Sequence, residues 1–232
     1  MTLTYKMPQR SEAWYKIRKG IITASSAGRV IPPGMRKTFM YKLLAEIMRG
    51  EVEHLAISEP MQRGMDYEDE ARDAYIAKQG SEVEEVGFCI SEDLPGVGCS
   101  PDGLVGPEGL VEIKCPNTST HIQYLMEGPK RDYVMQMQFQ MLVTDRKWCD
   151  FVTWDDRVKN KDGILGITRI YRDDEKIQIM KNCIGAMQKQ MIPFLAKYEI
   201  DYPLALPFLP DSPEDCADKS GLQKEMESLK DE

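Results

Sequence analysis

The sequence is poor in histidine, with His54 and His121 as the only two in 232 residues. A catalytic zinc ion commonly takes two or three imidazole ligands, so this scarcity argues against zinc-hydrolase chemistry. It also argues against catalytic triads built on histidine. Any metal would therefore be held mainly by carboxylate and carbonyl oxygens, a ligand set that favours Mg²⁺, with Mn²⁺ as a substitute.

The six cysteines form no Cys-x-x-Cys pair, and most of them have apolar neighbours in the sequence. They occupy positions 89, 99, 115, 149, 183 and 216. This pattern predicts reduced core cysteines rather than zinc ligands or a disulfide framework. The chain also lacks the run of about 18 apolar residues that a membrane span requires, and its start lacks the apolar region of a secretory signal. We therefore expect a cytoplasmic protein that does not bind membranes.

Acidic residues outnumber basic ones, and the net charge of −8 at first argues against a nucleic-acid partner. The two signs are unevenly distributed, however. Residues 1–50 contain ten Lys and Arg residues but only Glu12 and Glu46 as acids, a net charge of +8 that leaves −16 for residues 51–232. A basic surface that faces a polyanion can therefore coexist with an acidic body. The alternative is chance clustering of basic residues on solvated helix faces.

Hydrophobic periodicity divides the chain into alternating helical and extended segments. Helices are expected at 11–20, 39–50, 58–79, 118–126, 130–144 and 173–198, and strands at 82–90, 96–99, 110–115, 147–154 and 164–171. A loop is expected at Pro32-Pro33-Gly34, and Thr23 or Ser25 is expected to cap a helix. This order favours an α/β or α+β fold in which helices flank a central mixed β-sheet.

Composition predicts one domain followed by a tail. The 232 residues, of which 42% are apolar and 29% charged, are enough for one large globular domain. We expect this domain over residues 1–200, with 1–50 as its basic, helical part. From Pro203 the chain becomes Pro-rich and then acidic, with nine acids against three lysines in 201–232. This segment is expected to be a separate C-terminal tail.

Two acids and a lysine stand out in the middle of the chain, where Ser100-Pro-Asp-Gly-Leu is followed by Glu112-Ile-Lys114. The segment 110–115 is apolar and β-branched apart from its two charges, which predicts a strand. Side chains alternate along a strand, so Glu112 and Lys114 should share one face. Asp102, in a Pro-Asp-Gly turn, and Glu112 would repel each other in apolar surroundings unless a cation lay between them. This predicts a divalent metal held by Asp102 and Glu112, with Lys114 beside it; the alternative is a weak surface ion pair between Glu112 and Lys114.

Two helices carry further candidates for this site. Glu68 lies in the predicted helix 58–79, where it could equally be one acid on a solvated face. Gln136, Gln138 and Gln140 are threaded through an apolar, methionine-rich helix. Buried amides are costly without partners, so at least one of these glutamines should face a polar site. The alternative is that they form hydrogen bonds within the core.

A phosphate site is predicted near the N-terminus. Arg18 offers a bidentate contact, and the helix start at Thr23-Ala-Ser25-Ser26 offers N–H groups and hydroxyls. Serine caps are common and most bind no ligand, which is the alternative. Ser100 adjoins Asp102, so the phosphate site and the metal are expected to lie close together.

Taken together, these segments resemble the lambda exonuclease family, the alkaline exonucleases of viral recombination, within the PD-(D/E)xK nuclease fold. The resemblance spans about residues 10–175, and its segments occur in the family's order. They are Ala13-Trp-Tyr-Lys-Ile-Arg18-Lys-Gly-Ile-Ile-Thr-Ala-Ser25, Tyr67-Glu68-Asp-Glu-Ala-Arg72, Cys99-Ser-Pro-Asp102-Gly, Glu112-Ile-Lys-Cys-Pro116 and Gln136-Met-Gln138. Each motif is weak alone, and the combination is highly specific.

The resemblance implies a role for each candidate residue. The implied metal ligands are Asp102, Glu112, the main-chain carbonyl of Ile113, and Glu68. The residues implied to orient and activate the attacking water are Lys114 and Gln136. Those implied to bind the 5′-terminal phosphate of the digested strand are Arg18, Ser25 and Ser100. Met61 falls near an apolar wedge that separates the two DNA strands.

The resemblance also implies an activity and partners. It implies a processive, Mg²⁺-dependent 5′→3′ exonuclease on double-stranded DNA ends, which releases mononucleotides and leaves a 3′ overhang for a single-strand annealing protein. It further implies a homotrimeric ring in the cytoplasm of a bacterial host, encoded by a phage or prophage. Three alternatives stay open: an endonuclease of the same fold that cuts restriction sites or junctions, a non-catalytic DNA-binding subunit, and a metal enzyme for small phosphates.

Overall fold

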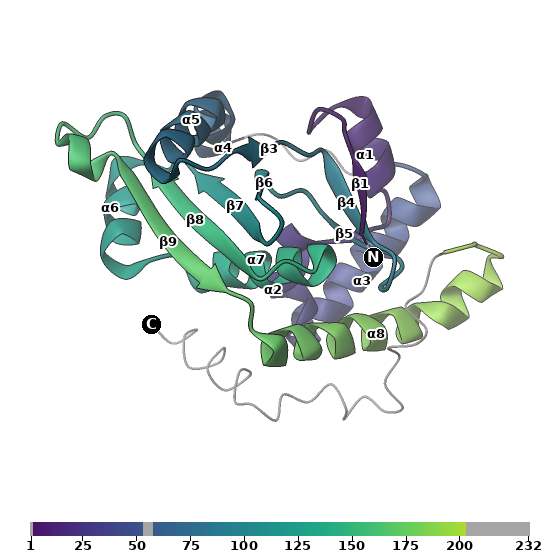
Figure 1. Ribbon diagram of the computed structural model, residues 1–232. Helices are drawn as coiled ribbons and strands as arrows, with labels where there is room; N and C mark the ends of the chain where they lie inside the picture. The colour runs from purple at the N-terminus through teal and green to yellow at the C-terminus, as the bar shows by residue number, and fades with distance from the viewer. Residues whose placement is uncertain (1, 53–57, 203–232) are drawn as a thin grey trace.

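The computed structural model, which describes residues 2–52 and 58–202, contains two mixed β-sheets flanked by helices (Figure 1). One sheet has the order β1 (Thr2–Tyr5), β4 (Phe88–Ser91), β5 (Val97–Cys99) and β2 (Ile22–Thr23). The other has the order β3 (Val83–Glu84), β6 (Gly103–Val105), β7 (Gly109–Lys114), β8 (Trp148–Trp154) and β9 (Leu165–Tyr171). The mixed α/β class is confirmed, although its strands are divided between two sheets.

Parallel pairing occurs once in each sheet, between β2 and β5 and between β7 and β8, and the other neighbouring strands are antiparallel. The predicted strand 82–90 contributes to both sheets, because β3 pairs with β6 whereas β4 pairs with β1 and β5. The chain passes from one sheet to the other again at residues 100–102, between β5 and β6. Asp102 therefore lies at the junction of the two sheets.

The helices follow the predicted order, with two corrections. They are α1 (Glu12–Arg18), the 3₁₀ turn η1 (Ala24–Ser26), α2 (Ala27–Val30), α3 (Pro33–Arg49), α4 (Glu59–Asp66), α5 (Glu68–Gln79), α6 (Thr118–Glu127), α7 (Arg131–Thr144), η2 (Lys161–Gly163) and α8 (Asp174–Lys197). The loop predicted at 32–34 is wrong from Pro33 onward, because proline suits the first turn of α3. The single helix predicted over 58–79 is interrupted at Tyr67, whose φ of −116° is not helical.

The five-stranded sheet is covered on both faces. Val111 and Ile113 pack in a cluster with Ala71 and Tyr75 of α5, whereas Leu110 packs in the main core that includes the buried face of α7. Glu112 shares the parity of Leu110, so it also faces α7. The strand alternation therefore places a buried acid between the sheet and α7.

The remaining general predictions concern cysteines and membranes. Cys89, Cys99, Cys115, Cys149 and Cys183 are buried and form no disulfide among the described residues, as predicted. Cys216, His54 and the tail from residue 203 lie outside the described residues. Within the described ranges, none of the helices combines the length and the apolar character needed to cross a bilayer.

Candidate active site

The ammonium group of Lys114 lies where the oxygens of the central motif converge. Its Nζ contacts Glu112 Oε1, donates to the main-chain oxygen of Ile113 at 2.9 Å and lies 3.9 Å from Asp102 Oδ2. Asp102 Oδ2 in turn accepts a hydrogen bond from Ile113 N at 2.6 Å, which fixes the turn against β7. Glu112 and Lys114 thus share one face of the strand, as predicted. One carbonyl and two carboxylates surround a single positive charge.

Glu112 is buried, with 1% of its side chain exposed. Burial raises its pKa to about 7; Asp102 also raises it, against the lowering effect of Lys114 and of the hydrogen bond from Gln140. The pKa of Lys114 is raised because the charges of Glu112 and Asp102 outweigh the lowering effect of burial. Lys114 is therefore a permanent cation at neutral pH.

Two glutamines of α7 hold the carboxylate of Glu112. Gln136 Nε2 donates to Oε1 and Gln140 Nε2 donates to Oε2, each at 2.6 Å. Gln138, on the other side of the helix, donates to Tyr171 O and accepts from Asp173 N instead. The prediction that at least one glutamine faces a polar site is confirmed. The sequence assigned a role to Gln136 alone of the three, although the i, i+4 spacing puts Gln140 on the same helix face.

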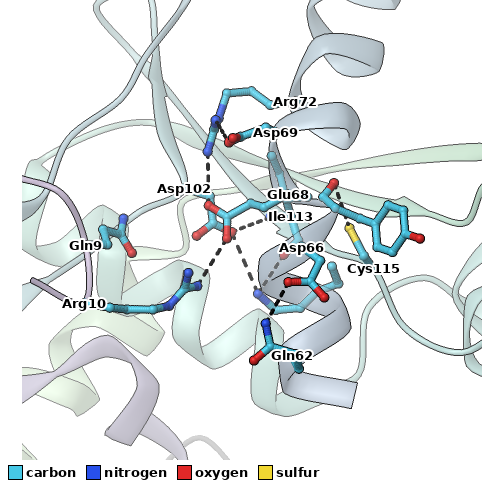
Figure 2. A network of polar contacts seen from close by, with 12 residues as sticks. Gln9, Arg10, Gln62, Asp66, Glu68, Asp69, Arg72, Asp102, Ile113 and Cys115 are labelled. Carbon is cyan, nitrogen blue, oxygen red and sulfur yellow. Dashed lines mark hydrogen bonds and ion pairs between the residues drawn. The ribbon is translucent and has the colours of Figure 1, made fainter. Parts of the chain in front are cut away.

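Glu68 reaches the same region from the first turn of α5. Its Oε2 accepts from Arg10 at 3.3 Å and its Oε1 from Arg72 at 3.1 Å, so it is held by two arginines (Figure 2). Burial, followed by the charge of Asp102, raises the pKa of Glu68. Glu68 lines the same cavity as Asp102 and Lys114, and 19% of its side chain is exposed, so it is not an acid on a solvated face.

The donor set suits a hard divalent cation. Asp102, Glu112 and Ile113 present oxygen atoms to one cation, the Lys114 ammonium, and burial together with the charge of Asp102 raises the pKa values of Glu112 and Glu68. In the part of the chain that the structure describes, no three acidic, cysteine or histidine side chains already form a metal-binding group. The fit therefore rests on two carboxylates and one carbonyl, with Glu68 turned toward its arginines.

A cavity of about 370 Å³ opens beside this cluster. Its lining includes Arg10, Glu68, Asp102, Lys114 and Met61, the last exposed on α4. The predicted wedge residue is thus brought to the same pocket as the acids. Tyr133 of α7 also lines this cavity, and the centroid of its ring lies 5.3 Å from Lys114 Nζ.

A second cavity, of about 170 Å³, brings Arg18 and Ser25 together. Arg29 and Lys42 line it as well, two cations that the sequence did not single out. Burial lowers the pKa of Arg18 to about 10. Glu46 lines the cavity too, and its charge acts on Arg18. Three cations against one carboxylate give the pocket the residues of an anion site.

Ser100 is not part of the second cavity's lining. Its Oγ donates to Gly87 O at 2.8 Å and accepts from Trp14 Nε1 at 2.8 Å. The guanidinium of Arg18 stacks on the ring of the same tryptophan, with its central carbon 3.8 Å from the centroid of the Trp14 ring. Trp14, which the sequence analysis did not assign to the site, therefore connects Ser100 to Arg18. Only its position in the Ala13–Ser25 motif pointed to it.

The chain matches known proteins over most of its described length. The profile of the YqaJ-like viral recombinase domain matches residues 13–147, more than half of the chain. An uncharacterized protein of Acanthamoeba polyphaga mimivirus is 26% identical over 218 residues. That match covers 82% of this chain, and the chain spans 39% of the length of the mimivirus protein.

Two solved structures share the fold. An alkaline exonuclease (LHK-Exo) from Laribacter hongkongensis, also solved in complex with dAMP, is 40% identical, with a TM-score of 0.76 over 82% of this chain and 96% of that chain. A phage-related exonuclease from Haemophilus somnus 129PT is 16% identical, with a TM-score of 0.62 over 77% of this chain and 96% of that one. The second likeness concerns the fold alone.

Proposed function

Because the chain belongs to the family of YqaJ-like viral recombinase domains, a lambda exonuclease-like family, we propose that it is a metal-dependent DNA exonuclease. The observation that carries the proposal is the convergence of Asp102, Glu112 and Ile113 oxygens on one cation beside an open pocket. The likeness to an alkaline exonuclease along 96% of that enzyme's chain supports the same activity. Mg²⁺ is the proposed metal, with Mn²⁺ as a substitute.

The proposed metal ligands are Asp102, Glu112, the main-chain carbonyl of Ile113, and Glu68. When bound there, such a metal polarises the scissile phosphate, lowers the pKa of a bound water and neutralises charge on the leaving 3′ oxygen. Lys114 is a fixed positive charge because its pKa is raised. It favours the hydroxide form of the attacking water and offsets the negative charge on the pentacoordinate phosphate of the transition state. Gln136 holds the carboxylate of Glu112 and orients the water.

The second cavity is proposed to set the direction of digestion. Arg18 and Ser25 bind the 5′-terminal phosphate, while Ser100 is tied to Arg18 through Trp14. A terminal phosphate bound beyond the reaction centre sets the position of the next phosphodiester bond and favours movement in one direction. This supports 5′→3′ digestion of duplex ends, with Met61 of the first cavity as the strand-separating wedge.

Further proposals rest on the family likeness alone. The enzyme is processive, releases 5′-mononucleotides and leaves a 3′ overhang for a single-strand annealing protein. It works as a homotrimeric ring in the cytoplasm of a bacterial host, as a phage or prophage product. Native mass spectrometry of the purified chain tests the trimer: one dominant monomeric species would contradict it.

The proposed function is tested with end-labelled linear duplex and Mg²⁺. Substrates with a 5′-phosphate, with a 5′-hydroxyl and with no free end are compared in one gel. We expect rapid mononucleotide release from the 5′-phosphorylated end, slower release from the hydroxyl end and no cutting of the closed circle. Arg18→Ala should remove the difference between the two linear ends. Equal rates on both ends with the wild-type chain would contradict the proposed phosphate pocket.

The closed circle in this gel and a binding measurement separate the alternatives. A relaxed circle that is cut without a free end would identify an endonuclease. Binding to duplex without hydrolysis in Mg²⁺ or Mn²⁺ would identify a non-catalytic subunit. Binding that weakens steeply with salt supports a DNA substrate over a small phosphate, because phosphate contacts release counterions.

A further inference from the structure

The N-terminal segment that precedes α1 contributes a cation to the active-site pocket. Of the residues that line this cavity, Arg10 and Lys114 carry positive charge. Lys114 is already surrounded by the oxygens of Glu112, Ile113 and Asp102. The side chain of Arg10 is 44% exposed and contacts Glu68 through Nη2 alone, at 3.3 Å, within the described part of the chain. Its other N–H groups are directed at no acceptor there.

The backbone of Arg10 is strained. Its φ of 66° lies in the left-handed region, which side chains other than glycine rarely adopt. Two further described non-glycine residues have positive φ, Asp145 and Glu199, and both directly follow the ends of helices, where this conformation is common. Arg10 instead precedes the N-cap of α1. Strain at a pocket-lining residue is a pointer to function.

Contacts on both sides hold this conformation. Gln9 Nε2 donates to Val86 O at 3.2 Å and to Pro101 O at 3.1 Å, so the segment is tied to the residue before Asp102. Gly87 allows the close approach of the chain, because a Cβ there would lie 2.3 Å from Met7 O. Ser11 then caps α1 by accepting from Trp14 N at 3.3 Å. Gln9 therefore holds the strained residue beside the turn that carries Asp102. Figure 2 shows the Arg10 side chain directed at Glu68.

We propose that Arg10 is a catalytic residue that binds a non-bridging oxygen of a DNA phosphate inside the pocket. This inference rests on the proposed nuclease function. A phosphate that enters a pocket lined by Glu68 and Asp102 needs positive charge besides a metal, and a guanidinium binds phosphate through paired N–H donors. Arg10 reaches the pocket while its partner, Glu68, is one of the proposed metal ligands. Phosphate and Glu68 thus lie within reach of the same guanidinium.

A simpler role for Arg10 would be to neutralise Glu68. Arg72 already does so, with Nη2 at 3.1 Å from Glu68 Oε1. The side chain of Arg72 is 8% exposed and does not line the pocket. Both arginines contact Glu68, and Arg72 also contacts Asp69 and Glu85. Of the two, Arg10 alone lines the pocket. Replacing each in turn separates substrate binding from support of Glu68.

The test uses the full chain with Arg10→Gln, Arg10→Lys and Arg72→Lys. Three duplexes with a 5′-phosphate each carry one uncharged methylphosphonate, at the first, second or third linkage, and a fourth duplex is fully charged. Binding of each duplex is measured in chelator, so that no cleavage occurs. We expect one of the three neutral linkages to weaken binding to the wild type by about tenfold, the worth of a charge-assisted hydrogen bond. Arg10→Gln should bind that duplex and the fully charged duplex equally, whereas Arg72→Lys should keep the wild-type difference.

Single-turnover cleavage completes the test. At saturating Mg²⁺, Arg10→Gln should be slower than wild type by at least about tenfold, and Arg10→Lys should recover part of the loss. The role of Arg10 is overturned if Arg10→Gln retains the wild-type penalty for the neutral linkage or the wild-type rate. If the wild-type chain itself releases no nucleotides, it is the proposed function that fails instead.

Discussion

Two buried carboxylates of the five-stranded sheet have opposite electrostatic surroundings. Glu112 lies in β7 and Asp155 directly follows β8, with 1% and 0% of their side chains exposed. Burial raises the pKa of Glu112 to about 7. Burial acts in the same direction on Asp155, yet hydrogen bonds from Arg157 and Thr118 outweigh it and lower that pKa to about 2. Both side chains are shielded from solvent, but Glu112 lies deeper in the protein than Asp155 and has fewer charged partners, so depth and partners together separate the two pKa values.

The partners of the two acids also differ. Asp155 accepts from the guanidinium groups of Arg157 and Arg63 and from the hydroxyl of Thr118, at 2.6 to 3.1 Å. Glu112 has two neutral amides and one ammonium, which it shares with other oxygens of the site. Asp155 is a satisfied structural anion that joins α4 to the loop after β8. Glu112 has a single ammonium as its charged partner and a raised pKa, a combination that marks candidate functional acids.

The largest expected effect is the loss of hydrolysis in Glu112→Gln. The substitution keeps the size of the side chain, and Gln140 can reverse its amide to accept from the new N–H₂ group. We expect a fall in the cleavage rate of about 10³-fold or more, because a neutral amide is a poor ligand for a hard cation. Single-turnover digestion of 5′-phosphorylated duplex measures it.

The stability of the same variant supplies its control. Unfolding of Glu112→Gln should stay within about 2 kcal/mol of wild type, since removing a buried carboxylate offsets part of the cost to Lys114, which keeps Asp102 as its anion. Mg²⁺ should raise the melting temperature of the wild type and leave that of the variant unchanged, because the ion stabilises only the state that binds it. A Mg²⁺ response that survives in Glu112→Gln would exclude Glu112 as a metal ligand.

Asp155→Asn should give the reverse pattern. Arg157 would lose its anion and Arg63 would keep only Asp156, so the loss of charge at this buried position should cost about 2 kcal/mol. We expect the free energy of unfolding to fall by about that amount, as measured with urea. The cleavage rate at low temperature should remain within about threefold of wild type. A variant as stable as wild type but inactive would reverse the roles assigned to the two acids.

The pH dependence of stability, measured in chelator, should separate the two acids by sign. The pKa of Asp155 is lowered by folding, so its contribution is present above about pH 4 and is lost as the pH falls toward 2; its size is about 2 kcal/mol. The pKa of Glu112 is raised by folding, so its contribution is present below about pH 4.5 and is lost as the pH rises through about 7. Asp155→Asn should flatten only the acid limb, and Glu112→Gln only the neutral one. Urea titrations at pH 3, 5 and 8 would refute this assignment if either variant changed the wrong limb.

The local pattern of the sequence was enough to predict one half of this comparison. Alternation along 110–115 predicted that Glu112 and Lys114 share a face, and the Pro-Asp-Gly turn placed Asp102 beside them. Asp155 gave no comparable signal, since its partners Arg63 and Thr118 come from distant segments and meet it only after folding. Contacts between distant segments produce no local pattern in the sequence from which they could be predicted.

The N-terminal part of the site shows the same limit. Arg18 and Ser25 were predicted from a motif within a few residues of each other, and they line one cavity. Ser100 was expected to join them, but Trp14 lies between Ser100 and Arg18. Arg10 was not identified because its role depends on a left-handed backbone and on the contacts of Gln9 across the sheet junction. Composition and spacing do not encode either feature.

The smallest expected effect concerns Gln140, whose hydrogen bond lowers the pKa of Glu112. Gln140→Leu removes this donor, so the pKa of Glu112 should rise and the rising limb of the pH–rate profile should move to higher pH. The loss of one hydrogen bond, about 1 kcal/mol, corresponds to a shift of about half to one pH unit. Gln138→Leu is the matched control on the same helix, since its amide contacts Tyr171 and Asp173 instead. Gln138→Leu should lower stability without moving the pH–rate profile. An equal shift of the profile in both variants would mean that α7 acts through packing rather than through the charge of Glu112.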